Sequence, residues 1–177
     1  MSMEFFTWPW MELFFQEDTE KYKFAHLSSA LLFLPYGVAV DEFQHVVYEN
    51  PEMTPAERKA AWKKIEEIYL PHRDYDGNHY LEEGGIWQRQ AHIYASPFYY
   101  IDYTLAQICA FQFWKRSREE FDTAWKDYVH LCGLGGSMSF TKLVKEAGLL
   151  SPFEDGCVES VIDHIDGYLN SVDDLKL

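Results

Sequence analysis

The sequence has few residues of the kinds that mark secreted scaffolds or membrane spans. Its 177 residues include three cysteines, ten glycines and seven prolines. Cys109, Cys132 and Cys157 are widely spaced and form no Cys-x-x-Cys pair, which argues against a disulfide scaffold and a thiolate zinc site. The longest apolar run, residues 30–40, is shorter than the roughly 20 residues that a membrane span needs. We therefore expect a cytoplasmic location and no membrane partner.

Basic residues are also scarce. Fifteen Lys and Arg against 29 Asp and Glu give a formal net charge of −14, which repels phosphate backbones and anionic lipid headgroups. We therefore expect no nucleic acid partner. Hydrophobic residues make up 47% of the chain and aromatic residues 18%, which is too apolar for a disordered protein.

Helix signals dominate what is present. Thr54-Pro55-Ala56-Glu57 combines a capping threonine, a proline at the first helical position and the glutamate of a capping box, and it predicts a helix that ends near Pro71. Further helices are predicted over residues 19–34, 38–48, 98–114, 117–131, 139–147 and 157–170, with the helical pattern also resuming near residue 86. Pro35-Tyr36-Gly37 predicts a kink or a tight turn between the first two.

Residues 72–85 are predicted to form the one substantial loop, because turn formers are frequent there and a helical period is absent. Strand-like alternation is not convincing anywhere. The sequence therefore predicts an all-α fold, a multi-helix array in which residues 1–177 form a single unit without an interdomain linker.

One candidate metal site lies on a predicted helix. Asp41-Glu42-Phe43-Gln44-His45 places two ligand types one helical turn apart with a glutamate between them, as in the His-Glu-x-x-His motif of zinc proteases. Aspartate in place of the first histidine would change the charge at the metal. We favour the alternative, a helical acid pair in which His45 bonds to Asp41 or to a neighbouring segment.

A second constellation joins His92 to Tyr99, Tyr100 and Tyr103. At about 100° per residue, the three tyrosines fall within one arc of a helix, so their hydroxyls could point the same way. Phenols beside an imidazole supply neutral hydrogen-bond donors, which suit a developing oxyanion. Half-buried tyrosines whose hydroxyls reach water are the alternative, and spacing alone leaves both readings open.

Two loops have weaker signals. Asp74, Asp76 and Gly77 resemble part of a calcium loop, but the acids are not spaced as in an EF-hand. The glycine-rich residues 133–137 could cradle a phosphate only after a strand, and no strand is predicted there. We expect a polar loop and a helix–helix turn, respectively.

Several long motifs resemble one known family. They are SMEFFTWPW at residues 2–10, FLPYGVAVDEFQH at 33–45, YLPHRDYDGN at 69–78, and WQRQAH at 87–92 running into SPFYYIDY at 96–103. Together they resemble the carboxy-terminal part of oligoendopeptidase F, a family akin to thimet oligopeptidase, over nearly the whole chain.

The resemblance implies a largely helical zinc endopeptidase that cleaves short peptides and binds zinc through a His-Glu-x-x-His helix and a downstream glutamate. The sequence contains none of these ligands, so the resemblance implies a fragment of a larger catalytic domain. We expect the intact enzyme to bind zinc. For this chain alone we expect no catalytic zinc and no activity. The expected partners are short peptide substrates and a complementing amino-terminal segment that carries the zinc motif.

The resemblance also assigns roles to individual residues. His92 and the tyrosine set Tyr99, Tyr100 and Tyr103 look like the family's histidine and tyrosine that hydrogen-bond the substrate carbonyl as it becomes tetrahedral. Arg89 and His79 are weaker candidates for substrate contacts. Two alternative functions remain. One is a non-catalytic helical domain that binds peptides or a partner chain through the half-cleft lined by His92, Tyr99 and Tyr103, which the missing segment would otherwise cover. The other is self-association through that same half-cleft.

Overall fold

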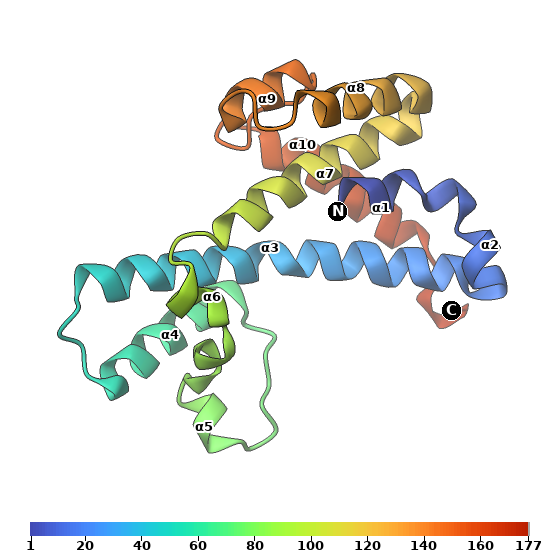
Figure 1. Ribbon diagram of the computed structural model, residues 1–177. Coiled ribbons are helices and arrows are strands. Elements are labelled where there is room, and N and C mark those ends of the chain that lie inside the picture. Colours follow the sequence, from blue (N-terminus) through green and yellow to red (C-terminus); the bar gives the residue numbers. More distant parts are fainter. Residues whose placement is uncertain (177) are drawn as a thin grey trace. The chain divides into compact units, whose positions relative to one another are not determined.

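The computed structural model describes residues 1–176, and the regular elements within that range are all helices (Figure 1). This confirms the all-α prediction. The chain divides into two compact units. Unit 1 comprises Met1–Leu31 and the chain from Leu105 onward, and unit 2 comprises Leu32–Thr104. The assignment of the chain to one larger catalytic domain stays a prediction.

The helices of unit 1 are α1 (Ser2–Phe6), η1 (Trp8–Trp10), α2 (Glu12–Phe15), η2 (Gln16–Asp18), α8 (Phe121–Leu134), α9 (Phe140–Glu146), α10 (Cys157–Ser171) and η4 (Asp174–Lys176). Those of unit 2 are α4 (Pro55–Tyr69), α5 (His79–Glu82), η3 (Gly85–Arg89) and α6 (Ala91–Ala95). Two longer helices, α3 (Thr19–Glu49) and α7 (Ile101–Glu119), contribute residues to both units.

The predicted interruption of α3 is wrong. The helix runs from Thr19 to Glu49 with Pro35 inside it, although proline removes one backbone donor and crowds the preceding turn. Burial offsets this cost, since Phe43 and its apolar neighbours in the next turns are fully buried. Gly37 permits the close approach of Thr104 to α3, because any Cβ there would collide with the Thr104 side chain.

Residues 72–85 form a loop as predicted, except that α5 occupies one turn of it. The cap of α5 explains the difference: the Asn78 side chain accepts a hydrogen bond from the backbone N–H of Leu81 at 3.3 Å. The remaining predicted helices are present with ends shifted by a few residues.

One stretch, Trp8–Glu49, is long and apolar enough to cross a membrane by length and composition. A core helix of a soluble protein passes the same test, so this is weak evidence. The expectation of no membrane partner therefore stays a prediction.

The core of unit 2 lies between the second half of α3, α4, η3 and α6. Its buried members are Tyr36, Ala39, Val40, Phe43, Trp62, Ile65, Leu70, Ile86, Trp87 and Ile93. Phe43 packs edge-on against Trp62, with ring centroids 5.4 Å apart, and lies 4.9 Å from the ring of Trp87. These contacts fix η3 and α6, which carry the residues of the candidate site, against α3.

A buried carboxylate ties the long loop of unit 2 to α4. Glu66 is 3% exposed and accepts hydrogen bonds from the Trp62 indole N–H at 3.2 Å and from the Tyr75 hydroxyl. Arg73 lies 3.7 Å from the same carboxylate. Burial and the bond to Glu66 raise the pKa of Tyr75, so its hydroxyl stays a donor.

The core of unit 1 is aromatic. Phe6 lies against Phe113, Phe121, Trp125 and Tyr128, with ring centroids between 5.1 and 5.8 Å apart. Val144, Ala147 and Leu149 close the cluster from α9 and the residues after it. Figure 1 shows α8 and α9 side by side, in agreement with their contacts.

The capping box at α4 gives a testable prediction. The Thr54 hydroxyl accepts from the Glu57 backbone N–H at 3.3 Å, and the Glu57 carboxylate accepts from the Thr54 backbone N–H at 2.7 Å. Thr54→Ala should lower the free energy of unfolding by about 1 kcal/mol in urea titrations. Thr54→Ser keeps the capping oxygen and should stay close to wild type; equal losses in both variants would contradict a capping role.

Candidate functional site

A cluster of one imidazole and three phenols, the second constellation noted in the sequence, lies in unit 2. His92 is on α6, Tyr99 and Tyr100 lie in the connection that follows, and Tyr103 is in the first turn of α7. The His92 ring centroid lies 6.3 Å from Tyr99, 5.2 Å from Tyr100 and 5.7 Å from Tyr103. His92 is half-buried and Tyr99 is 46% exposed, so the cluster is open to solvent on one side.

The connection between α6 and α7 is held in an unusual conformation. Phe98 has a φ of +61°, in the left-handed region that side-chain-bearing residues rarely adopt. Its backbone N–H donates to the side-chain oxygen of Gln44 at 2.8 Å, and Gln44 is fully buried on α3. The Phe98 ring lies 4.9 Å from His45 and 5.1 Å from Tyr48. These contacts from α3 set the direction in which the next residues, Tyr99 and Tyr100, leave the turn.

A second set of contacts links the imidazole of His92 to α3 through Gln90 and Tyr36. The Tyr36 hydroxyl donates to Oε1 of Gln90 at 3.0 Å, and Nε2 of Gln90 lies 2.7 Å from Nδ1 of His92. Sequence reasoning missed Tyr36, Gln44 and Gln90, because glutamines and a core tyrosine carry no motif of their own. The only signal was their position within the long motifs that resemble the peptidase family.

The surroundings raise the pKa of two of the three phenols, Tyr100 and Tyr103. Burial, with smaller contributions from Tyr36 and Tyr103, raises the pKa of Tyr100 to about 12. A side-chain hydrogen bond with Tyr99 is the largest cause that raises the pKa of Tyr103, followed by burial and by the Tyr99 and Asp102 charges. Both groups are therefore protonated donors at neutral pH.

The two weaker candidates lie in different places. Arg89, at the end of η3, is exposed and its charge and hydrogen bond act on the Tyr36 hydroxyl. His79 begins α5, is 93% exposed and pairs with Glu82 at 3.6 Å. Among the described residues, the His92 ring contacts Gln90 and the three tyrosines. Arg89 is thus linked to the cluster through Tyr36, whereas His79 is not among its contacts.

Asp41 and His45 form the helical acid pair that we favoured. Nε2 of His45 lies 3.5 Å from Oδ2 of Asp41, one turn apart on α3. Burial raises the pKa of Asp41, and the Asp102 charge adds to this while His45 opposes it. No group of three His, Cys, Asp or Glu side chains that could hold a metal ion occurs among the described residues.

The two loops with weak motifs act as turns. The Asp74 carboxylate accepts from the backbone N–H of Asp76 at 2.9 Å, and Asp76 and Gly77 follow with positive φ. Gly135, with a φ of +52°, ends α8 and starts the connection to α9.

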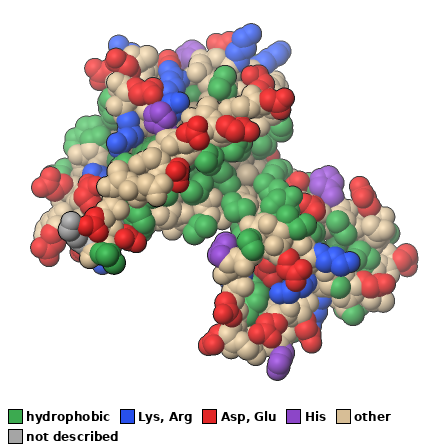
Figure 2. All heavy atoms as spheres, turned by 180° about the vertical axis from the view of Figure 1, so that it is seen from behind, with side chains coloured by type: hydrophobic (Ala, Val, Ile, Leu, Met, Phe, Trp, Pro, Cys, Tyr) green, Lys and Arg blue, Asp and Glu red, His purple; other side chains and the backbone are tan. Residues whose placement is uncertain are grey.

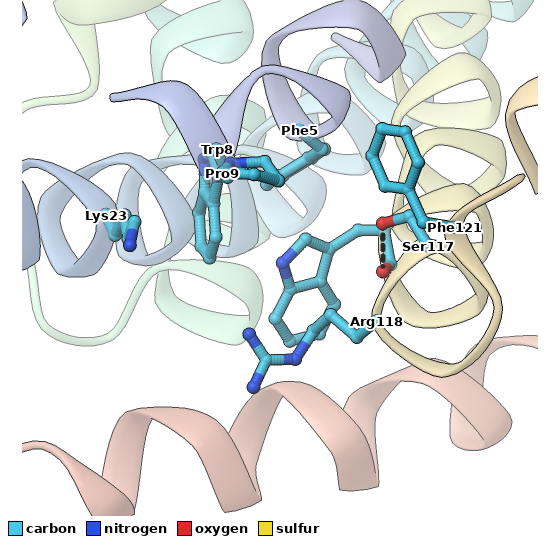
Figure 3. Close-up of a pocket in the computed structure, with 8 residues that line it drawn as sticks. Phe5, Trp8, Pro9, Lys23, Ser117, Arg118 and Phe121 are labelled. Atoms are coloured by element: carbon cyan, nitrogen blue, oxygen red, sulfur yellow. Dashed lines mark hydrogen bonds between the residues drawn. The ribbon is translucent and has the colours of Figure 1, made fainter. Parts of the chain in front are cut away.

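Unit 1 contains a separate cavity of about 370 Å³, lined by aromatic side chains and two cations (Figure 3). Two of its polar groups have partners within the protein: Lys23 donates to Glu20 at 2.8 Å, and the Ser117 hydroxyl donates to the Trp114 carbonyl at 2.8 Å. The Arg118 guanidinium lies 5.4 Å from the Trp114 ring centroid. Lys23 and Ser117 are thus engaged within the protein, whereas the buried Trp114 indole N–H has no hydrogen-bond partner.

Acidic side chains are spread over the face shown in Figure 2, in line with the net charge of −14. Arg89 is one of the exposed cations among the 15 Lys and Arg residues of this acidic protein. The exclusion of nucleic acid remains an expectation based on this charge.

The raised pKa of Tyr100 predicts a pH dependence. Below pH 10 the phenol is neutral in folded and unfolded chains, whereas between about pH 10 and 12 it ionises only in the unfolded chain, so folding loses stability. Tyr100→Phe should flatten the fall in unfolding free energy over that range. Tyr48→Phe, at a half-exposed ring, is the control and should retain the wild-type slope. A Tyr100→Phe slope equal to wild type would show that the phenol is not protected.

Comparison with known proteins identifies the family. Residues 1–161 match Peptidase family M3. An oligoendopeptidase F structure solved at 3.1 Å is 72% identical over 99% of this chain and 31% of its own, with a TM-score of 0.96. PZ peptidase A with an inhibitor is 73% identical over 98% and 31%, with a TM-score of 0.95. An oligoendopeptidase F from Bacillus anthracis str. Ames is 60% identical over 99% and 28%, with a TM-score of 0.84. A search of curated proteins found no match. The chain thus spans under a third of these solved relatives, and it belongs to peptidase family M3.

Proposed function

We propose that this chain is the carboxy-terminal part of the catalytic domain of a zinc-dependent oligoendopeptidase and stabilises the oxyanion formed when a short peptide is hydrolysed. The observation that carries the proposal is the packing of the His92 ring against Tyr99, Tyr100 and Tyr103 at 5.2–6.3 Å. Membership of family M3 and the similarity to solved oligoendopeptidases F support peptide hydrolysis as the chemistry.

The donors suit this reaction. Hydrolysis of an amide passes through a tetrahedral intermediate in which negative charge gathers on the former carbonyl oxygen. An imidazole N–H and a phenol O–H bond weakly to the neutral carbonyl and more strongly to the oxyanion, so they lower the barrier rather than only binding substrate. Tyr100 and Tyr103, whose pKa values are raised above the ordinary value of a phenol, are neutral donors at the pH of the reaction. The proposal leaves open which tyrosine donates.

The zinc ion that the family implies does not fit the described residues of this chain, because they contain no group of three suitable ligands. In this proposal the zinc ligands lie on the part of the relatives that this chain does not cover, and we derive no step through the metal. The proposed partners are short peptides and a complementing segment that carries the zinc motif. Arg89 and His79 are proposed substrate contacts, and the proposed location is the cytoplasm.

Reconstitution tests the proposal directly. The purified chain alone should contain no stoichiometric zinc and should not cleave peptides. Mixing it with a polypeptide that carries the remaining, zinc-binding part of an oligoendopeptidase F should restore peptidase activity that a chelator removes. Zinc bound by the chain alone together with chelator-sensitive activity would contradict the proposal.

The roles of His92 and Tyr103 are tested in the reconstituted enzyme or in a full-length protein that contains this chain. His92→Ala removes one proposed oxyanion donor and should lower kcat by about 10²–10³-fold, and Tyr103→Phe should do the same if Tyr103 is the donating tyrosine. His130→Ala, at an exposed histidine of α8, is the control and should keep the wild-type rate. Normal turnover in either site variant would remove that residue from the mechanism.

A second candidate function is a peptide-binding domain without catalysis. A specific observation favours it: a cavity of about 340 Å³ in unit 2, lined by Val47, Tyr48, Pro51, Arg58, Trp87, Ile93 and Tyr94. This mostly apolar lining would suit a hydrophobic peptide side chain. Peptide binding to the chain in the absence of a zinc-bearing partner would favour this function, and light scattering would detect self-association.

A further inference from the structure

A continuous chain of polar contacts ends at His92. The guanidinium of Arg89 acts on the hydroxyl of Tyr36, which donates to Oε1 of Gln90 at 3.0 Å. Nε2 of the same amide lies 2.7 Å from Nδ1 of His92. The side chains of Tyr36, Gln90 and His92, from α3 and the start of α6, are thereby joined, and the Arg89 charge acts on the first of them.

The chemistry of the Tyr36 and Gln90 side chains determines which group donates and which accepts in these contacts. The Oε1 atom of Gln90 can only accept, so the Tyr36 hydroxyl donates its single proton to it. The amide oxygen of Gln90 accepts that proton, which turns the NH₂ group toward the imidazole. A neutral imidazole that accepts at Nδ1 must carry its proton on Nε2.

The side chain of Tyr36, which begins this series of polar contacts, is held rigidly. Tyr36 is 9% exposed, and its ring packs edge-on against Trp62 and Tyr100 with centroids 6.4 and 5.9 Å apart. Arg73 lies over the same ring, 5.0 Å from its centroid. The hydroxyl is therefore fixed in place and can orient Gln90 without reordering.

We propose that Gln90, oriented by Tyr36, is a positioning residue that holds the His92 ring with Nδ1 as the hydrogen-bond acceptor and Nε2 as the N–H donor. This rests on the proposed function, in which His92 donates a hydrogen bond to the oxyanion. Gln90 itself does not touch the substrate. Its effect is to select one tautomer and one ring orientation, so the donor is ready before the substrate arrives.

Nuclear magnetic resonance of the 177-residue chain tests this without any activity. Histidine labelled with ¹⁵N, observed through two-bond correlations to the ring protons, shows which nitrogen carries the proton. At about pH 8.5, two units above the ordinary histidine pKa, wild-type His92 should have its proton on Nε2. The Nδ1 resonance should be shifted from that of the 93% exposed His79 by its hydrogen bond. A proton on Nδ1 in the wild-type chain would overturn the proposal.

Gln90→Glu replaces the hydrogen-bond donor that faces Nδ1 of His92 with an acceptor. A carboxylate can only accept, so Nδ1 should become protonated and its resonance should move accordingly. Gln88→Glu makes the same charge change at an exposed glutamine whose oxygen already accepts from Tyr80, and it should leave His92 unchanged. An unprotonated Nδ1 in folded Gln90→Glu, or an equal effect of Gln88→Glu, would overturn the proposal.

Gln90→Met is the second variant, in case the glutamate variant fails to fold. It removes the donor without adding charge, so the Nδ1 resonance should shift to that of His79; an unchanged resonance would overturn the proposal. The tautomer readout is independent of peptide cleavage. If His92 has the expected tautomer but His92→Ala retains full activity in the reconstituted enzyme, the proposed function fails while the positioning role of Gln90 stands.

Discussion

The hydrogen bond from the Phe98 backbone to Gln44 is the contact on which the candidate site depends. A phenylalanine at a φ of +61° is strained, and such a conformation persists only when its surroundings hold it. Gln44 is fully buried and offers a fixed acceptor from α3, 54 residues away in sequence. The tyrosines that follow are therefore positioned by a distant helix and not by their own local sequence.

The same helix supports the site at two levels. Through Gln44 it sets the backbone before α7, and through Tyr36 it reaches the side chain of Gln90 beside His92. These two residues are eight positions apart on α3, a little over two turns, so they lie on a similar face. The core of Phe43, Trp62 and Trp87 packs against this part of α3 and makes it a rigid base.

The sequence was sufficient for much of the fold, and the reasons are local. The capping box at Thr54 and the turn-rich residues 72–85 carry their structural meaning within a few positions, so the start of α4 and the loop could be predicted. The break predicted at Pro35 is wrong because the burial of apolar side chains on both sides of it outweighs the unfavourable free energy of a proline inside a helix. The local sequence does not show this burial. Tertiary packing decides such cases.

The candidate site divides in the same way. The predicted helical arc of Tyr99, Tyr100 and Tyr103 is wrong for the first two, which precede α7, although the His92 ring does lie beside Tyr100 and Tyr103. The left-handed turn at Phe98 and the role of Gln90 could not be predicted, since both arise from contacts with residues more than 50 positions away. A buried glutamine has no sequence pattern that separates an orienting role from plain packing.

Gly37 has a further consequence for the spacing of unit 2. Its missing side chain leaves room for Thr104, whose buried hydroxyl has no hydrogen-bond partner. The separation between this part of α3 and the first turn of α7 is thus set by hard contact with bare backbone and not by an attractive bond. Tyr103 is the residue next to that contact, so adding even one methyl group at Gly37 would displace the segment that carries its phenol.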